Sequence, residues 1–388
     1  MSLFDKLFGN RPRPGRDDGY FQTLTAYSPA FSTWNGQLYE AELIRSAIDA
    51  RARHISKLKC EFIGAAKPKL KSKMLKSPNE WQTWSQFLYR VSTILDNTTN
   101  CFIVPVFDEF EEVSGYYPVL TSMCQIKDYS GEPWLQYTFQ SGQTAAIELK
   151  RCAILTKFQF QDDFFGSGNA ALTPTMQMLS IQNQGVREAV KNSNTFRFMA
   201  RVNNFSKPSD LANERKRFSR ENLQGEDGGI LLFPNTYSDI RQIEQKAYTV
   251  DKSEREEIRT SVYNYFGVNE DVLQNKAFGD RWQAFYEGAI EPFAVQFSEA
   301  LTRAMFTFSE QGNGNMVMLT ANRLQYMSTQ EKLNVSSQLA DRGILNRDEV
   351  REIWNLPPLP DGAGQAYVIR GEYKNADEAT EETNNEQT

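Results

Sequence analysis

The sequence predicts an α+β protein in which a strand-rich section lies between segments of helical periodicity. Apolar positions recur at helical spacing in residues 38–58 and again from Trp282 to Phe308. Between Cys101 and Phe158 the apolar runs are short and are separated by Gly, Pro, Ser and Asp, which is typical of hairpins. The length of 388 residues leaves room for about two to three compact units.

The N-terminal half of the chain is predicted from its periodicity. Residues 1–35 are rich in Gly, Pro, Arg and Ser and are expected to form an arm that orders only against a partner. Helices are expected at 38–58 and 79–95, the second with Trp81 and Trp84 on its apolar stripe. Seven lysines and one glutamate between residues 57 and 76 are expected to form a solvated face rather than a site for an anionic partner. The expected strands are 101–107, 116–120, 134–139, 146–149 and 154–158.

Residues 173–194 are predicted to form a long helix that is unusually polar. Such a helix either lines water or bridges neighbouring molecules. A small α/β subdomain is expected to follow, with an apolar strand at Ile230–Phe233 closed by Pro234. A charged helix is then predicted at 250–266 and a loop at 267–280.

The region from Trp282 to Phe308 gives the clearest helical pattern. Pro292 interrupts it, and a kink is expected near Gly288 because proline clashes with the carbonyl four residues earlier. Two short helices are expected at 330–339 and 347–354. The second begins with a capping box between Asn346 and Glu349. Beyond Gly371 the tail carries six acidic residues and one lysine, and it is expected to be disordered.

The composition excludes several classes of protein. The single histidine, His54, excludes Ser–His triads, HExxH zinc sites and multi-histidine metal centres, and it is itself expected to be a packing or surface residue. Four cysteines lie far apart and are expected to be buried thiols. No apolar run reaches the roughly 18 residues of a membrane span, and no secretion leader is recognised at the N-terminus. The net charge of −6 argues against a protein that grips nucleic acid tightly.

Three motifs have a functional interpretation beside a structural one. Residues 166–171 match the loose GxGxxA pattern of dinucleotide-binding loops, but the acidic residue expected after a second strand is absent, and Glu188 lies within the polar helix. No GxxxxGK[ST] loop occurs. The carboxylates at 108–112 and 162–163 are expected to lie in solvated turns rather than to bind metal. The basic, Phe-containing span 187–220 suits either a single-strand binder or an oligomer interface.

Several stretches, in order along the chain, resemble the portal proteins of long-tailed double-stranded DNA bacteriophages. Asn269, Gln274 and the missing glycine after Asn203–Asn204 depart from the usual pattern of that family. The matching stretches are the MSLFDKLF opening, the helix Glu42–His54, Gly166–Pro174, Gly228–Leu231, the Asp251–Val268 helix ending in Phe-Gly-Val, Glu291–Pro292, and Gly343–Arg351 followed by Leu356–Pro358.

The resemblance implies the portal fold and the following division of the chain. The expected parts are a flexible arm at 1–35, the wing at 36–172, a stem helix at 173–194, the clip at 195–249, a second stem helix at 250–266, the tunnel loop at 267–281, the kinked helix and a strand of the wing at 282–324, the helical crown at 325–370, and the acidic tail at 371–388.

The resemblance also implies a function. The chain is expected to form a ring, normally of twelve subunits, at one capsid vertex of the virion after assembly in the bacterial cytoplasm. Double-stranded DNA would pass through the ring, and the expected partners are the large terminase, a head–tail adaptor and the major capsid protein, with no membrane and no cofactor. No catalytic or metal-binding residue is expected. The site residues implied are Asn275, Lys276, Phe278 and Arg281 facing DNA, Gln184, Arg187, Lys191, Glu254 and Glu257 in the channel stem, and Arg215, Lys216, Arg217 and Arg220 for docking the motor or adaptor.

Elementary geometry agrees with a conduit. Twelve helices spaced about 10 Å apart give a ring about 38 Å across, and removing one helix width leaves roughly 28 Å, which admits a duplex. A conduit must hold DNA weakly, because every strong phosphate contact has to break during movement. A charge of −6 per chain becomes about −72 over twelve copies, which repels the negatively charged DNA. A head–tail adaptor or other virion interaction protein, and a NAD-dependent oxidoreductase, remain as alternatives.

Overall fold

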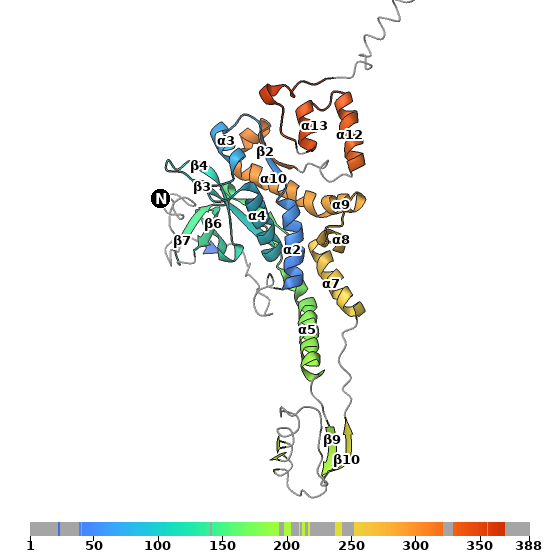
Figure 1. The fold of residues 1–388 in the computed structure, drawn as a ribbon. Helices are drawn as coiled ribbons and strands as arrows, with labels where there is room; N and C mark the ends of the chain where they lie inside the picture. Colours follow the sequence, from blue (N-terminus) through green and yellow to red (C-terminus); the bar gives the residue numbers. More distant parts are fainter. Residues whose placement is uncertain are drawn as a thin grey trace, which may run out of the picture. The chain divides into compact units, whose positions relative to one another are not determined.

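The computed structural model describes residues 22–23, 39, 41–139, 142–193, 198–202, 209, 212–213, 216–217, 237–242, 252–320, 329–354 and 356–368. It divides into two compact units, Met1–Thr173 with Thr260–Thr388 and Pro174–Arg259 (Figure 1). The mixture of helices and antiparallel sheets confirms the predicted α+β class.

The first unit contains most of the described elements. In chain order these are β1 (Gln22–Thr23), α2 (Glu42–Ile55), β2 (Lys59–Ile63), α3 (Pro68–Lys76), α4 (Trp84–Thr98), β3 (Asn100–Phe107), β4 (Val113–Val119), β5 (Cys124–Tyr129), β6 (Glu132–Thr138), β7 (Thr144–Glu148), β8 (Ala153–Thr156), the end of α7 (Lys252–Phe266), α8 (Glu270–Leu273), α9 (Asp280–Phe285), α10 (Glu291–Met305), α11 (Phe308–Gly312), β11 (Met316–Thr320), α12 (Thr329–Asp341) and α13 (Arg347–Ile353).

Two antiparallel sheets form the strand-rich section. One has the order β4-β3-β8 and the other β1-β5-β6-β7. All eight residues of β3 are buried, as expected for a central strand, and Phe102 packs edge-to-face on Phe165 at 5.4 Å. Ile126 and Leu135 of the second sheet belong to the same apolar cluster as Phe102, so both sheets contribute to one core. The five predicted strands are confirmed as β3, β4, β6, β7 and β8.

Besides β1, two strands of the first unit, β2 and β5, escaped the sequence prediction. Both carry polar or charged residues at alternate positions, and β2 is at most half-buried along its length. β11, which pairs with β2, is apolar except for Thr320 and lies within 282–324, where the resemblance implied a strand. The N–H groups of Val317 and Leu319 on β11 donate to the hydroxyls of Thr302 and Ser298 on α10, both at 2.9 Å. These bonds satisfy backbone donors of β11 with side chains of the helix, which protects an edge that would otherwise be open.

The N-terminal arm needs one correction. Gln22 and Thr23 pair antiparallel with Asp128 and Lys127 of β5, so at these two residues the expectation of order only against a partner is wrong. The other residues of the expected arm, 1–21 and 24–35, lie outside the described part of the chain, as does the acidic tail at 371–388.

A helical core of α2, α4 and α10 supports the sheets (Figure 1). Phe87 on α4 lies 6.3 Å from Phe297 on α10, ring to ring, and both side chains are fully buried. Burying an aromatic side chain contributes about 1.5–3 kcal/mol, so such pairs dominate the stability of this core.

The predicted start of α4 at Asn79 is wrong. The helix begins at Trp84, where Thr83 and Gln86 form a capping box. The Asn79 amide instead donates to the carbonyl of Tyr116 on β4 at 2.8 Å, which holds the preceding segment against the sheet. Trp81 therefore lies outside the helix and is exposed, not on the apolar stripe.

The lysine-rich segment is not simply a solvated face. Lys71 is buried and its ammonium donates to the carbonyls of Ile63 and Gly64, at 2.8 and 2.7 Å. Lys59 forms an ion pair with Glu352 of α13. The physical reason is that a lysine stem can lie along apolar surface while its ammonium reaches backbone carbonyls.

The helix that was expected to kink near Gly288 is interrupted there by a π-helical turn at Tyr286–Ile290, between α9 and α10. Pro292 occupies the first turn of α10, where its missing N–H costs nothing within that helix. The single predicted helix is thus three segments, and a separate short helix, α11, follows it with its own capping box at Thr307 and Glu310.

The C-terminal helices confirm the sequence pattern closely. Asn346 accepts from the N–H of Glu349 at 2.9 Å, and Glu349 accepts from the N–H of Asn346 at 2.8 Å. After α13 the chain returns, and Asp348 accepts from the N–H of Leu359 at 2.8 Å. Trp354 donates to the Ser336 hydroxyl of α12 at 3.4 Å, which ties the two helices together.

The second unit contains α5 (Thr173–Ser193) from residue 174 onward, the antiparallel pair β9 (Phe198–Val202) and β10 (Tyr237–Gln242), and the start of α7. The long polar helix and the charged helix are confirmed. The expected strand at Ile230–Phe233 lies outside the described residues.

The cysteine prediction holds for three of the four thiols. Cys101, Cys124 and Cys152 are buried, Cys60 is half-buried, and all four are free. Burial raises the pKa of the Cys101 thiol, which keeps it neutral and unreactive.

Candidate functional site

The loop predicted to face DNA begins with a tight helix end. At the Phe266-Gly267-Val268 turn, Gly267 has φ +67°, a conformation that favours glycine. Its N–H donates to the Asn264 carbonyl at 3.1 Å, and the N–H of Val268 donates to that of Tyr263 at 2.9 Å. Phe266 and Val268 are buried on either side, so the turn fixes where α7 ends and the loop begins.

The loop is partly helical, which corrects the expectation of an irregular segment. Asn269 caps the short helix α8, and its side chain accepts from the N–H of Val272 at 3.0 Å. Asparagine at the position where the family usually has proline is therefore a good helix start. The N–H of Lys276 then donates to the Asp271 carbonyl at 2.7 Å, and Asn275 takes a positive φ of 57°.

All four residues implied to face DNA are exposed and lie together on this loop. Phe278 leaves 74 % of its surface exposed. The Lys276 ammonium donates to Gln274 at 2.6 Å, while Arg281 donates to Asp271 at 2.7 Å. The loop 267–281 has three acidic and two basic residues, hence a net charge of −1. The charge of Arg281 is locally opposed, and Lys276 carries the more available positive charge.

The stem candidates lie on exposed faces of two helices. Gln184 and Arg187 are exposed on α5, and Glu254 and Glu257 are exposed on α7. Lys191 lies in the last turns of α5.

Sequence reasoning missed an apolar pair on the same helix as the polar stem residues. Met178 and Ile181 on α5 leave 55 % and 67 % of their surface exposed. Their spacing of three residues places them one turn apart on one face of the helix. Two apolar residues at this spacing in a polar sequence could have predicted the pair. An apolar stripe on a polar helix is typical of a surface that another chain covers.

The candidates for docking a motor or adaptor are described only in part. Lys216 and Arg217 lie in a helical turn and are exposed, whereas Arg215 and Arg220 fall outside the described residues.

The glycine-rich motif at 166–171 has a structural role. A Cβ on the buried Gly166 would lie less than 3.0 Å from the carbonyl oxygen of Lys157. The Gly166 N–H donates to the side chain of Asn100 at 2.6 Å. Glycine is needed here because the protein's own backbone approaches closely. In a dinucleotide site, the phosphates of the ligand would make this close approach instead.

The carboxylate clusters weighed as metal sites form turns. Asp108 accepts from the N–H groups of Phe110 and Glu112, both at 3.0 Å. Asp162 accepts from those of Phe164 and Phe165, at 2.8 and 3.1 Å. Within the described ranges, no group of three or more His, Cys, Asp or Glu side chains could hold a metal ion.

His54 is a packing residue. Its ring lies edge-on to Phe285 of α9, with centroids 5.3 Å apart. Burial, with smaller contributions from the charges of Lys57 and Arg53, lowers the pKa of His54 from 6.5 to about 4. The imidazole is therefore neutral at physiological pH.

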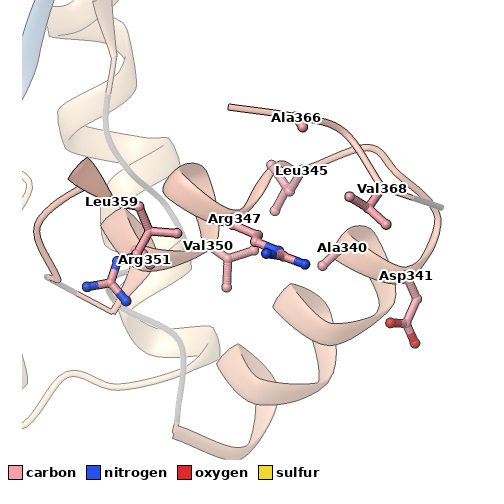
Figure 2. Close-up of a pocket in the computed structure, with 9 residues that line it drawn as sticks. All are labelled: Ala340, Asp341, Leu345, Arg347, Val350, Arg351, Leu359, Ala366 and Val368. Atoms are coloured by element: carbon pink, nitrogen blue, oxygen red, sulfur yellow. The ribbon is translucent and has the colours of Figure 1, made fainter. Parts of the chain in front are cut away.

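One cavity lies within the C-terminal helical segment (Figure 2). It has a volume of about 500 Å³, and its lining contains two arginines, one aspartate and six aliphatic side chains. Arg347 extends toward Ala340 on α12. This lining lacks the paired nucleophile and base of a covalent-catalysis site. The lining residues are Ala340, Asp341, Leu345, Arg347, Val350, Arg351, Leu359, Ala366 and Val368.

Comparison with known proteins identifies the class. The model of the phage portal protein family matches residues 42–355, and the chain belongs to that family, whose members are structural and not enzymatic. The chain is therefore a portal protein of the phage type. A search among curated protein sequences gave no match. Among the described residues, no helix is both long and apolar enough to cross a membrane.

Solved structures share the fold. A protein of the neck of a native gene transfer agent particle, computed with C12 symmetry, is 13 % identical, with a TM-score of 0.52 over 82 % of this chain and 91 % of its own. A portal protein of the HK97 phage family from Corynebacterium diphtheriae is 12 % identical, with a TM-score of 0.52 over 75 % of this chain and 96 % of its own. At these identities the likeness establishes the fold alone.

Proposed function

We propose that twelve copies of this chain form a ring at one capsid vertex, and that double-stranded DNA is packaged and later ejected through the centre of that ring. A separate terminase ATPase drives the movement. Membership of the portal family supports this proposal, as does the C12 symmetry applied to the neck of the gene transfer agent. The division into arm, wing, stem, clip, tunnel loop and crown set out above is part of the proposal.

The observation that carries the proposal is the exposed pair Met178 and Ile181 on α5. A helix with polar neighbours on most sides and an apolar stripe needs a second chain to cover that stripe. In a ring, α5 of each copy packs on the apolar pair of its neighbour. Such a head-to-tail contact gives a closed ring when the rotation from one copy to the next divides a full turn into a whole number of subunits.

Electron microscopy and native mass spectrometry of the purified chain test the ring directly. We expect closed rings with countable symmetry. The double variant Met178→Asp with Ile181→Asp is expected to give folded monomers with an unchanged circular dichroism spectrum. Leu75→Asp, at an exposed apolar residue of α3, is the matched control and leaves rings intact. Monomers alone from the natural sequence, even at high concentration, would refute the proposal.

The loop 267–281 is proposed to touch the phosphates of passing DNA. Its net charge of −1 keeps the contact weak, which suits a conduit. Because Asp271 opposes Arg281, we expect Lys276→Gln to reduce DNA packaging or retention more than Arg281→Gln, with rings intact in both variants. Lys69→Gln, on α3, serves as the control. An effect of Lys276→Gln no larger than that of the control would exclude a phosphate contact.

The basic residues at 215–220 are proposed to dock the packaging motor during assembly and the head–tail adaptor afterwards, while the wing meets the major capsid protein. Lys216 and Arg217 are exposed, as such a contact requires. Reversal of both charges is expected to leave rings unchanged and to abolish co-sedimentation of the large terminase with them. Unchanged co-sedimentation would remove these residues from the docking surface.

A further inference from the structure

The turn that joins α9 to α10 has an unusual hydrogen-bond pattern. Residues 286–290 form a π-helical turn, and the N–H of Glu291 donates to the carbonyl of Tyr286, five residues earlier. A π turn inserts one extra residue into the helix, so it rotates everything on its N-terminal side by about 100° relative to an unbroken α-helix. The orientation of α9, and of the loop that α9 carries, therefore depends on whether this turn is kept.

Arg51 of α2 holds the carbonyl of Ala289 within this turn. Its Nε and Nη2 both donate to that oxygen, at 3.2 and 3.1 Å. The two atoms belong to one planar guanidinium, so they approach the carbonyl in a fixed geometry. The central carbon of the same group lies 5.9 Å from the centre of the Phe293 ring on α10, which is within the range of a cation–π contact.

The remaining nitrogen of Arg51 is held from the opposite side. Nη1 is paired with Oδ1 of Asp96 on α4, and both side chains are buried. The ammonium of Lys157 donates to the same carboxylate oxygen at 2.7 Å. A buried Arg–carboxylate pair is costly to break, because either partner alone would be an uncompensated charge. The guanidinium is thus anchored on α4 while it holds the turn.

The ring contact between α2 and α9 is less directional: His54 meets Phe285 ring edge to ring face at 5.3 Å. Within the α9 side itself, Trp282 stacks on Tyr286 at 5.2 Å. Aromatic packing of this kind tolerates rotation better than a forked hydrogen bond does. The contact that selects one register of the turn is therefore the pair of bonds from Arg51 to Ala289.

We propose that Arg51 is a positioning residue for the loop 267–281: it keeps the turn at 286–290 in its π-helical register and thereby fixes the direction in which α9 presents the loop. The consequence of the loop direction for DNA contact rests on the proposed function. The effect of Arg51 on the hydrogen bonding of the turn does not depend on that function. Within the loop, the bond between Arg281 and Asp271 links α9 to α8.

Hydrogen–deuterium exchange of the full-length protein, followed by mass spectrometry, tests the proposal. In Arg51→Lys, which keeps a positive charge beside Asp96 but lacks the fork, we expect peptides covering 280–293 to exchange at least tenfold faster. Peptides covering β3 are expected to be unchanged. Lys157→Met is the matched control: it removes the other cation from Asp96 without touching Ala289, and we expect it to leave exchange at 280–293 within twofold of the natural protein.

Two outcomes overturn the proposal: unchanged exchange at 280–293 in Arg51→Lys, or the same local increase in Lys157→Met. If Arg51→Lys does not fold, the double variant Arg51→Met with Asp96→Asn removes the fork without leaving an unpaired carboxylate, and the same tenfold local increase is expected. Ring images of each variant separate this question from the proposed function. A loss of protection in intact rings supports the positioning role, whereas an absence of rings in the natural protein counts against the portal function alone.

Discussion

Gly166 offers a sharp test of how the strand-rich section is connected to α5. A Cβ at this position would lie less than 3.0 Å from the Lys157 oxygen and 2.9 Å from its carbonyl carbon, where ordinary contacts begin at 3.4 Å. The clash is with backbone, which cannot rotate away as a side chain can. In Gly166→Ala the segment after β8 must therefore move, or the chain before α5 must move away from it.

The magnitude follows from the bonds that such a movement breaks. The N–H of Gly166 donates to Asn100 at 2.6 Å, and the N–H of Ser167 donates to the Phe158 carbonyl at 2.9 Å. On the other side of the clash, the N–H of Lys157 donates to the Thr99 carbonyl at 2.8 Å. At about 1 kcal/mol for each bond, the free energy of unfolding should fall by about 3 kcal/mol. This lies at the upper end of the usual loss from overpacking, about 1–3 kcal/mol.

Urea unfolding at a fixed protein concentration, followed by circular dichroism, measures this change. Gly168→Ala is the matched control two residues away, because its added Cβ meets nothing within 4 Å and its φ of −66° suits alanine. We expect the control to be neutral or more stable by up to about 1 kcal/mol. A loss below about 1 kcal/mol in Gly166→Ala, or an equal loss in Gly168→Ala, would refute the reasoning.

Three further predictions concern single side chains. The pKa of His54 is 6.5 in the unfolded chain and about 4 in the folded chain, so the stability that the neutral imidazole contributes is complete above pH 6.5 and is lost as the pH falls toward 4. In His54→Gln, the free energy of unfolding should therefore fall less between pH 6.5 and pH 4, by about 2 kcal/mol after a discount for partial exposure, as measured by urea unfolding. Identical pH profiles for the two proteins would contradict this. Asn346→Ala removes the cap of α13 and should cost about 1 kcal/mol in thermal unfolding, and no measurable loss would show that the cap is dispensable. Phe297→Ala should cost about 4 kcal/mol, whereas Val295→Ala, exposed on the same helix, should cost less than about 0.5 kcal/mol; similar losses would place Phe297 outside the core.

The sequence pattern predicted elements wherever the pattern is local. The capping box at Asn346 and Glu349 forms as predicted because all its atoms lie within four consecutive residues. An interruption of the helix near Gly288 was predictable because a proline acts on the carbonyl four residues before it. The order of short matching stretches along the whole chain also indicated the portal family.

The errors lie where a residue's partner is distant in the chain. Asn79 was expected to start a helix, but its amide bonds to Tyr116 of β4. Lys71 was expected in solvent, but the turn after β2 surrounds its ammonium with carbonyls. The apolar pair on α5 went unnoticed because its two members stand among polar residues, and only the folded helix shows that both are exposed.

By itself, therefore, the sequence determined the α+β class, the capping box of α13 and the family. The tertiary structure decided which glycine is needed for close backbone approach, which lysine is buried, and that Arg51 reaches a carbonyl 238 residues away. The physical reason is range: periodicity and capping depend on neighbours within about one or two helical turns, whereas burial and buried charge depend on segments that only folding brings together.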